Sequence, residues 1–367
     1  MKIKDVKCEV YLLDPYESPR MMRWNKPLPV GKRSYTMLRI ITDDGIEGIS
    51  AWGKGISEGT ISAVKREIVG RDPFDREWIW QRLWYLYGRT VGEQPGLTLL
   101  SSVDIALWDL AGKALGQPIY KLLGGYRDKI KIYASSFGLP TTQEYIDEIL
   151  ECKERGITAY KIHPYWRMPD KDIELCRAVR KAVGDDMILM IDPSACYNRE
   201  GALRVGKVLD ELNFYWYEEP IADNDIEGMI MLREKLDVPM CATEVAPRSM
   251  YDIPEYLVRR AVDIVRCDTE MGSGGITPCK KIADTCNAFG MQCEIHGGGI
   301  ANLQLECTVK NCEFHEMFYP ERFSYQRRIP LKEYAKLDNE GYIHVPQKPG
   351  LGVEIDWEAL GKPAASY

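Results

Sequence analysis

Three acidic residues recur at one interval in the second half of the chain. Asp192, Glu218 and Glu244 stand 26 residues apart, and each comes at the end of a short apolar run. Three carboxylates that meet in one cleft cannot all stay ionised without a cation. A set of oxygen ligands suits a hard divalent ion, Mg2+ before Zn2+. The interval therefore predicts a magnesium site, if the elements between these residues bring them together.

Two further runs end on groups that could transfer a proton. The run ITAYKIH places Lys161 and His163 on one face of a strand and Ile162 on the other. His296 ends the run MQCEIH, one strand after Asp268, and an Asp that fixes the tautomer of an imidazole makes it a competent acid or base. A metal would stabilise the negative charge on a substrate carboxylate when the neighbouring proton leaves. We therefore expect the lysine, the two histidines and the aspartate to catalyse abstraction of a proton next to a carboxylate.

The other polar residues of these runs have simpler interpretations. Glu219 follows Glu218 directly, so strand alternation aims it away from the metal, and we expect it to brace a neighbouring strand. His315 and His344 are expected to be structural. His315 directly precedes Glu316, so strand alternation turns its side chain to the opposite face of the strand. His344 lies in the C-terminal segment.

The elements that must position these residues follow a regular order. From about residue 130 the chain alternates short apolar runs with amphipathic segments of helical period. The runs are IKIYAS, TAYKIH, MILMID, FYWYEE, VPMCATE, DIVRCD, MQCEIH and CEFHE. Strands separated by helices in this number predict an α/β fold, a (β/α)8-type barrel. Because active sites of such barrels lie at the C-terminal ends of the strands, the residues above should meet at one mouth.

Residues 1–125 have a different pattern, typical of an α+β capping domain. Two apolar runs are joined by the turn signal Asp44-Gly45. Apolar residues at helical spacing over 103–115 predict a buried helix that ends near Gly116. The expected division is 1–125 for the cap, 126–335 for the barrel with its catalytic residues, and 336–367 for a C-terminal segment that returns to the cap.

A long loop interrupts the cap. The segment DPYESPRMMRWNKPLPVGKR at 14–33 carries five basic side chains. Loops of this length inside compact domains are usually lids or disordered segments. The basic groups could meet a polyol acid or a second carboxylate, and the alternative is a solvated basic face. The candidate substrate-binding residues are Arg20, Arg23 and Trp24 in this loop, and Tyr165 and Trp166 after the second barrel strand.

The composition is that of a globular protein and argues against several classes of function. The chain has 367 residues, 45% of them apolar and 28% charged, and a net charge of −7. This charge disfavours nucleic acid and anionic membranes as partners, and no apolar run approaches the roughly 20 residues that span a bilayer. None of the eleven cysteines stands in a CxxC pair, and the start MKIKDVKCEVYLL lacks the apolar core of a signal peptide. We therefore expect a reduced, cytoplasmic protein.

With these residues in place, the chain resembles the enolase superfamily, in particular its mandelate racemase-like subgroup. The resemblance rests on SSVDIALWDLAGKALGQPIYKLLGG, on WYEEP and on the histidine of the seventh strand, and it covers nearly the whole chain. It implies Mg2+ held by the three carboxylates above, a dyad of Asp268 and His296, and Glu316 as an acidic residue near the substrate carboxylate. The motif of the second strand differs, because the family usually has Lys-x-Lys where this chain has Lys161 and His163.

The function that this pattern favours is dehydration of a sugar acid. The proton next to the carboxylate would leave, the β-hydroxyl would follow as water with a histidine as the acid, and the enol would become a 2-keto-3-deoxy acid. We expect a hydro-lyase with a small-molecule acid sugar as its partner, and a homo-oligomer. Three alternatives stay open: a racemase or epimerase of a 2-hydroxy acid in which His163 and His296 exchange the proton across opposite faces, a cycloisomerase of a sugar lactone, and a non-catalytic binding barrel.

Overall fold

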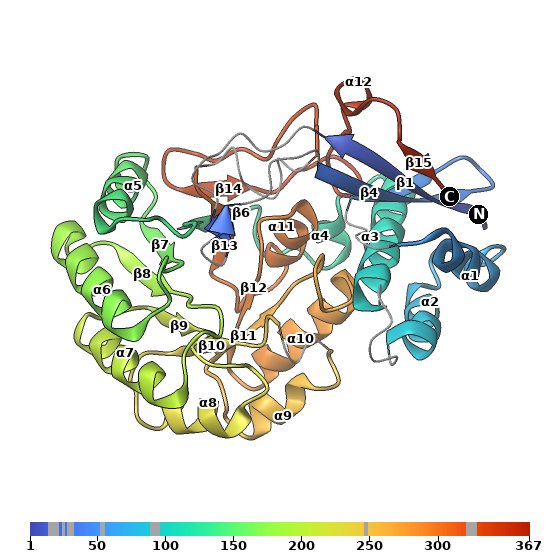
Figure 1. Ribbon diagram of the computed structural model, residues 1–367. Helices are drawn as coiled ribbons and strands as arrows, with labels where there is room; N and C mark the ends of the chain where they lie inside the picture. The colour runs from blue at the N-terminus through green and yellow to red at the C-terminus, as the bar shows by residue number, and fades with distance from the viewer. Residues whose placement is uncertain are drawn as a thin grey trace.

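The computed structural model describes residues 1–13, 33–51, 56–88, 96–245, 249–320 and 329–367, with two short strands besides, β2 (Met22–Arg23) and β3 (Lys26–Pro27). Its largest part is a barrel of parallel strands (Figure 1). The strands are β6 (Lys129–Ser135), β7 (Ala159–Ile162), β8 (Ile188–Ile191), β9 (Trp216–Glu218), β10 (Met240–Ala242), β11 (Ile264–Cys267), β12 (Gln292–Ile295) and β13 (Phe314–Phe318). They pair in the order β12-β11-β10-β9-β8-β7-β6-β13, which confirms the predicted (β/α)8-type barrel.

The helices that connect these strands cover the outside of the barrel (Figure 1). They are α5 (Thr142–Glu154), α6 (Pro169–Val183), α7 (Arg199–Glu211), α8 (Ile226–Arg233), α9 (Ile253–Val258), α10 (Ile276–Ala288) and α11 (Ile300–Glu306). Each turns an apolar stripe inward; in α6, Leu175, Val179 and Val183 are buried at helical spacing. Helix α5 begins with a capping box, in which Thr141 and Glu144 satisfy each other's backbone N–H groups.

The interior of the barrel has an apolar floor and a charged layer above it. The floor consists of Tyr133, Ala159, Met190, Trp216, Cys241, Ile264 and Phe314. The rings of Tyr133 and Trp216 meet edge to face, with their centroids 5.4 Å apart. Side chains two residues apart on a strand share a face, so the next inward positions along these strands bring Lys161, Glu218 and Arg266 into the layer above. The charged layer is therefore a direct consequence of strand alternation.

A second, antiparallel sheet forms the core of the cap. Its strands are β1 (Ile3–Leu13), β4 (Arg33–Thr42), β5 (Glu47–Ser50) and β15 (Ala365–Ser366), in the order β15-β1-β4-β5. The turn from β4 to β5 contains Gly45 with a φ of +85°, a conformation that suits glycine, as the Asp44-Gly45 signal predicts. The helices of the cap are α1 (Glu58–Ile68), α2 (Arg76–Leu83), α3 (Gly96–Leu115) and α4 (Ile119–Leu122), with a π-helical turn at Trp84–Gly88.

The C-terminal segment contacts both parts of the molecule. Strand β14 (Tyr342–His344) pairs with β6 of the barrel, and β15 pairs with β1 beyond the short helix α12 (Trp357–Leu360). Both chain ends therefore lie at the cap sheet (Figure 1). The boundaries expected at residues 125 and 335 stay predictions.

Helix α3 joins the cap to the barrel through two buried acids. The Asp104 carboxylate accepts hydrogen bonds from the backbone and hydroxyl of Thr277, in the first turn of α10. The Asp109 carboxylate accepts from the backbone N–H groups of Ile49 in β5 and Leu351 in the C-terminal segment. Burial raises the pKa of Asp104 to about 6, against the opposing hydrogen bonds from Thr277. The most recognisable helix of the sequence is thus a structural clamp.

The structure also bears on two expectations from the composition, the lack of a membrane-spanning helix and the reduced state of the cysteines. Over the part of the chain that the structure describes, no helix is both long and apolar enough to cross a membrane. All eleven cysteines fall within that part and are free thiols, ten of them buried. The burial of these free thiols agrees with the prediction that the cysteines are reduced residues of the core.

Candidate active site

The three acids at equal spacing lie on neighbouring strands. Asp192 directly follows β8, Glu218 is the last residue of β9, and Glu244 lies two residues beyond β10. These strands pair in parallel, β8 with β9 and β9 with β10. The carboxylates therefore form a row along one mouth of the barrel, as the sequence predicted, and Glu218 has no exposed surface.

Lys161 supplies a positive charge beneath this row. Its Nζ atom lies 3.0 Å from Glu218, 3.1 Å from Glu316 and 4.0 Å from Asp192. Burial alone would lower the pKa of Lys161, but Glu218 and Glu316 raise it well above its usual value. Lys161 is thus a fixed cation that several carboxylates share.

Arg266 is a second internal cation, and the sequence interpretation missed it. Its Nε atom lies 3.1 Å from Glu218 as an ion pair that lacks hydrogen-bond geometry, and its other nitrogens donate to Glu316 at 3.2 Å and to the Tyr133 hydroxyl at 3.1 Å. The side chain is fully buried. The sequence could have indicated this position. Arg266 and Asp268 are two residues apart in the run DIVRCD, so both side chains face the interior of the barrel.

His163 stands at the Asp192 end of the row. Its Nδ1 donates to the backbone carbonyl of Ser136 at 2.8 Å, which leaves Nε2 facing the site, 3.0 Å from Asp192. The ring lies nearly parallel to that of Phe318, with centroids 6.0 Å apart. Burial would raise the pKa of Asp192, but His163 and Lys161 hold it well below its usual value.

His296 stands at the Glu244 end of the row. Its Nδ1 lies 2.7 Å from Asp268, the partner that the sequence predicted, and its Nε2 lies 3.0 Å from Glu244 and 3.7 Å from Glu316. Burial would lower the pKa of His296, but Glu244 and Asp268 raise it to about 9. The two imidazoles therefore flank the carboxylate row, each with Nε2 turned toward it.

Glu316 and Glu219 are two further buried acids near the row, and each is held by hydrogen bonds. Glu316 accepts hydrogen bonds from the hydroxyl of Ser135 at 2.8 Å and the backbone of Gly297 at 2.9 Å, besides its contacts with the two buried cations. Glu219 accepts from the backbone N–H groups of Glu244 and Val245, both at 3.1 Å. Glu219 thus braces the segment that directly follows the neighbouring strand β10, close to what the sequence predicted.

The remaining histidines are structural, as expected. His315 lies outside the barrel interior, with Nδ1 2.6 Å from Glu306 of α11, and His344 pairs at the surface with Asp338. Neither contacts the carboxylate row in the part of the chain that the structure describes.

The described side chains are not arranged around an ion. Within the described ranges, no three acidic, histidine or cysteine side chains are grouped as the ligands of one metal. The carboxylate oxygens of the row contact basic groups instead. Lys161 contacts Glu218, and the two histidines contact Asp192 and Glu244 at the ends of the row. The metal site therefore stays a prediction.

The chemistry of the row nevertheless fits a hard divalent cation. All three members are carboxylates, the ligands that Mg2+ prefers. The acids exceed the permanent cations, and an uncompensated buried charge is costly. The acids of the cluster are Asp192, Glu218, Glu244, Asp268 and Glu316, against Lys161 and Arg266. Burial also raises the pKa of Glu244 to about 8, against the influence of His296 and Arg266.

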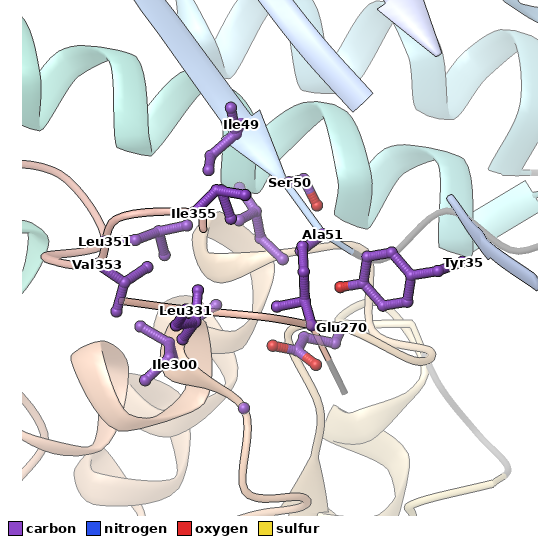
Figure 2. A pocket seen from close by; sticks show the side chains of 14 residues that line it. Tyr35, Ile49, Ser50, Ala51, Glu270, Ile300, Leu331, Leu351, Val353 and Ile355 are labelled. Carbon is purple, nitrogen blue, oxygen red and sulfur yellow. The ribbon is translucent and has the colours of Figure 1, made fainter. Parts of the chain in front are cut away.

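A cavity of about 50 Å³ lies between the cap and the barrel, close to this site. It is lined by Tyr35, Ile49, Ser50, Ala51, Ile105, Glu270, Gly299, Ile300, Ala301, Ile329, Leu331, Leu351, Val353 and Ile355. In Figure 2 the hydroxyls of Tyr35 and Ser50 and the carboxylate of Glu270 lie on the side of Ala51, and aliphatic side chains fill the other side. Sequence reasoning missed this cavity, because its wall combines residues from three distant parts of the chain.

The candidate substrate-binding residues are only partly placed. Arg20 and Trp24 lie outside the described residues, and so does the side chain of Arg23. Tyr165 and Trp166 follow β7 and are half-buried, with ring centroids 5.1 Å apart. Their role in binding stays a prediction.

A capped (β/α)8-type barrel with acids and bases at one mouth defines an enzyme of the enolase superfamily. Residues 144–359 match the enolase C-terminal domain-like family model, and residues 13–124 match the N-terminal domain of mandelate racemase and muconate lactonizing enzyme. The chain belongs to the mandelate racemase and muconate lactonizing enzyme family, as the resemblance predicted.

Relatives of known activity cover nearly the whole chain. Arabinonate dehydratase of Saccharolobus solfataricus is 30% identical over 370 residues, 96% of each chain. D-galactarolactone cycloisomerase of Agrobacterium fabrum is 29% identical over 388 residues, 98% of each chain. The crystal structure of D-glucarate dehydratase from Agrobacterium tumefaciens, complexed with magnesium, matches with a TM-score of 0.90 and 35% identity over 98% of both chains. Dehydratases, hydro-lyases of the kind predicted, are thus among its relatives.

Proposed function

We propose that this chain is a Mg2+-dependent dehydratase of a sugar acid. The observation that carries the proposal is the pair of imidazoles at the two ends of the carboxylate row, with the Nε2 atoms of His163 and His296 each 3.0 Å from an end member. A dehydratase needs a base for the α-proton and an acid for the leaving hydroxyl. The dehydratases among the relatives support the same reaction.

Each of these side chains has a distinct role in the proposed reaction. Asp192, Glu218 and Glu244 would hold Mg2+, which would stabilise negative charge on the substrate carboxylate. His163 accepts the α-proton at Nε2, because its Nδ1–H is committed to a backbone carbonyl. His296, oriented by its partner at Nδ1, protonates the β-hydroxyl as the carbon–oxygen bond breaks. Water leaves, and the enol tautomerises to a 2-keto-3-deoxy acid.

The test is a panel of acid sugars of all configurations, assayed for 2-keto acid formation with Mg2+ and, in parallel, for α-proton exchange in D2O. We expect keto acid from one or a few members, with exchange of a single α-proton. Inversion of the α-carbon without keto acid would establish a racemase. Turnover of lactones alone would establish the second candidate, a cycloisomerase, which the relative from Agrobacterium fabrum favours. A protein that neither turns over any member nor binds divalent metal would be a non-catalytic barrel.

The cellular setting is part of the proposal. Free cysteines that are mostly buried, with Cys196 exposed, suit a reducing compartment, and we propose the cytoplasm. A homo-oligomer stays a prediction, to be checked by light scattering.

A further inference from the structure

We propose that Asn302 is a positioning residue for the proposed acid, and that it fixes His296 and Asp268 relative to each other. Asn302 is buried in the first turn of α11, and the sequence interpretation gave it no role. The inference rests on the proposed function and deepens it, because it says what holds the acid in place.

The amide nitrogen of Asn302 contacts both members of the dyad. Its Nδ2 donates to the backbone carbonyl of His296 at 2.7 Å and to that of Gly297 at 3.1 Å. It also forms a longer hydrogen bond, of 3.4 Å, to Oδ1 of Asp268. One side chain therefore binds the backbone of the imidazole and the carboxylate that orients its ring.

The amide oxygen binds the segment that follows β11. Oδ1 of Asn302 accepts from the hydroxyl of Thr269 at 2.6 Å and from the backbone N–H of Thr269 at 3.0 Å. Because Thr269 directly follows Asp268, the carboxamide joins the segment after β11 to the turn after β12. Its orientation is determined, since a backbone N–H can only donate and a carbonyl can only accept. A reversed amide would place its NH2 group against an N–H and its oxygen against two carbonyls.

The two oxygens of Asp268 have different partners. Oδ2 lies 2.7 Å from Nδ1 of His296, whereas Oδ1 accepts from the backbone N–H of Glu270 at 2.6 Å and from Asn302. Rotation of the carboxylate away from the imidazole would break these contacts as well. The carboxylate is thus held in the orientation in which it meets the ring.

The turn that follows His296 depends on partners of this kind. Residues 297–299 are all glycine, and Gly297 has a φ of +81°. Glycines restrict the backbone least of all residues, so the turn does not keep its shape by itself. Glu316 accepts from the backbone N–H of Gly297 at 2.9 Å, and Asn302 donates to its carbonyl. Together the two side chains fix where the backbone of the imidazole lies.

The effect of Asn302 should be confined to one half of the reaction. In the described structure, none of the hydrogen bonds of its carboxamide reaches His163 or the carboxylate row. Proton transfer requires donor and acceptor within hydrogen-bond reach. A displaced His296 should therefore impair protonation of the leaving hydroxyl and leave removal of the α-proton by His163 intact.

The experiment measures the two halves separately in the purified, Mg2+-loaded protein. The variant N302L is close to asparagine in shape and removes these hydrogen bonds. With an acid sugar that the wild type converts, kcat for keto acid formation should fall about 10- to 100-fold, with KM and α-proton exchange in D2O within about threefold of the wild type. The double variant H296N/N302L should be no slower than H296N, because both changes act through one imidazole.

A milder variant covers the case in which N302L does not fold. T269V removes the hydroxyl that donates to the amide oxygen and keeps the backbone N–H that also donates to it. It should lower kcat for keto acid formation about two- to tenfold, as expected for one hydrogen bond, again without a matching loss of exchange.

The matched control is Q304M, in the same helix. The carboxamide of Gln304 is also buried; it accepts from the backbone of Tyr120 at 2.8 Å and donates to the carbonyls of Pro346 and Leu351, both at 3.1 Å. Its partners belong to α4 and the C-terminal segment. Q304M should lower stability in urea as N302L does, without separating keto acid formation from exchange. The Kd for Mg2+, measured by calorimetry, should be the same in both variants as in the wild type.

The outcomes that overturn the inference differ from those that overturn the proposed function. Equal loss of exchange and keto acid in N302L, or the same separation in Q304M, refutes the positioning role while the dehydratase assignment stands. Unchanged kcat in N302L, or in T269V where N302L does not fold, refutes it too, and so does a weaker affinity of N302L for Mg2+. A wild type that forms no keto acid from any configuration refutes the proposed function, and this inference falls with it.

Discussion

Replacement of Arg266 by methionine should destabilise the protein strongly. Arg266 is fully buried and lies 3.1 Å from Glu218 and 3.2 Å from Glu316. Without the guanidinium, those two carboxylates keep Lys161 as their remaining permanent cation, and the Tyr133 hydroxyl loses a donor. Removing one partner of a buried ion pair costs ~3–5 kcal/mol. We expect a loss of that size in the free energy of unfolding, measured by urea denaturation in the presence of a chelator.

Magnesium should recover part of this loss. A ligand that binds the folded state alone adds about 2.7 kcal/mol at 100 times its Kd. The gain should be larger in R266M than in the wild type, because a divalent cation then balances one more unpaired negative charge. R266K, which keeps the charge, should lose less. The control is R204M, which breaks an exposed pair with Asp170 and should stay within ~1 kcal/mol of the wild type. If R266M is as stable as R204M in chelator, Arg266 does not balance the charges of Glu218 and Glu316.

Three further predictions concern the row, the histidines and the clamp. Chelation should abolish activity and Mg2+ should restore it, whereas E218A should bind no ion by calorimetry; full activity after exhaustive chelation would contradict the metal assignment. H163N should show no exchange of the α-proton in D2O, and H296N should still exchange it while failing to form keto acid; the reverse pattern would exchange the two roles. Because burial raises the pKa of Asp104 to about 6, the folded carboxyl holds its proton at higher pH than the unfolded one. Its contribution to stability is full below about pH 4 and is lost as the pH rises through about 6. D104N should therefore cost more stability at pH 4.5 than at pH 7 in urea unfolding, and an equal cost would mean that Asp104 does not titrate in this window.

The barrel and the row of acids could be predicted because both depend on local periodicity. Runs such as MILMID and FYWYEE are short, apolar and separated by helical segments, and this alternation determines which strand follows which. Once strands are parallel neighbours, residues at the same strand end must lie side by side. Asp192 and Glu218 therefore needed no knowledge of tertiary contacts, and neither did the pairing of Asp268 with His296 on adjacent strands.

The partners of these residues were harder to predict because they depend on side-chain reach. Lys161 was expected beside a substrate carboxylate, yet its Nζ contacts Glu218 and Glu316, which lie two strands away from it on either side. A four-carbon side chain can extend in several directions from one backbone position, so alternation gives its face and not its partner. Arg266 was overlooked for the same reason, since a buried charge on a strand is rare unless several acids surround it.

In the cap, a stretch of sequence that identifies the family contains no residue of the candidate active site. The stretch SSVDIALWDLAGKALGQPIYKLLGG contains Asp104 and Asp109, and neither acid contacts the carboxylate row in the described structure. Asp109 accepts from the backbone of Ile49 at 2.9 Å, and the next residue is Ser50, which lines the cavity. The signature helix thus has a structural role: Asp104 and Asp109 hold it to α10, to the cap sheet and to the C-terminal segment, while the strand ends of the barrel supply the groups that would transfer the proton.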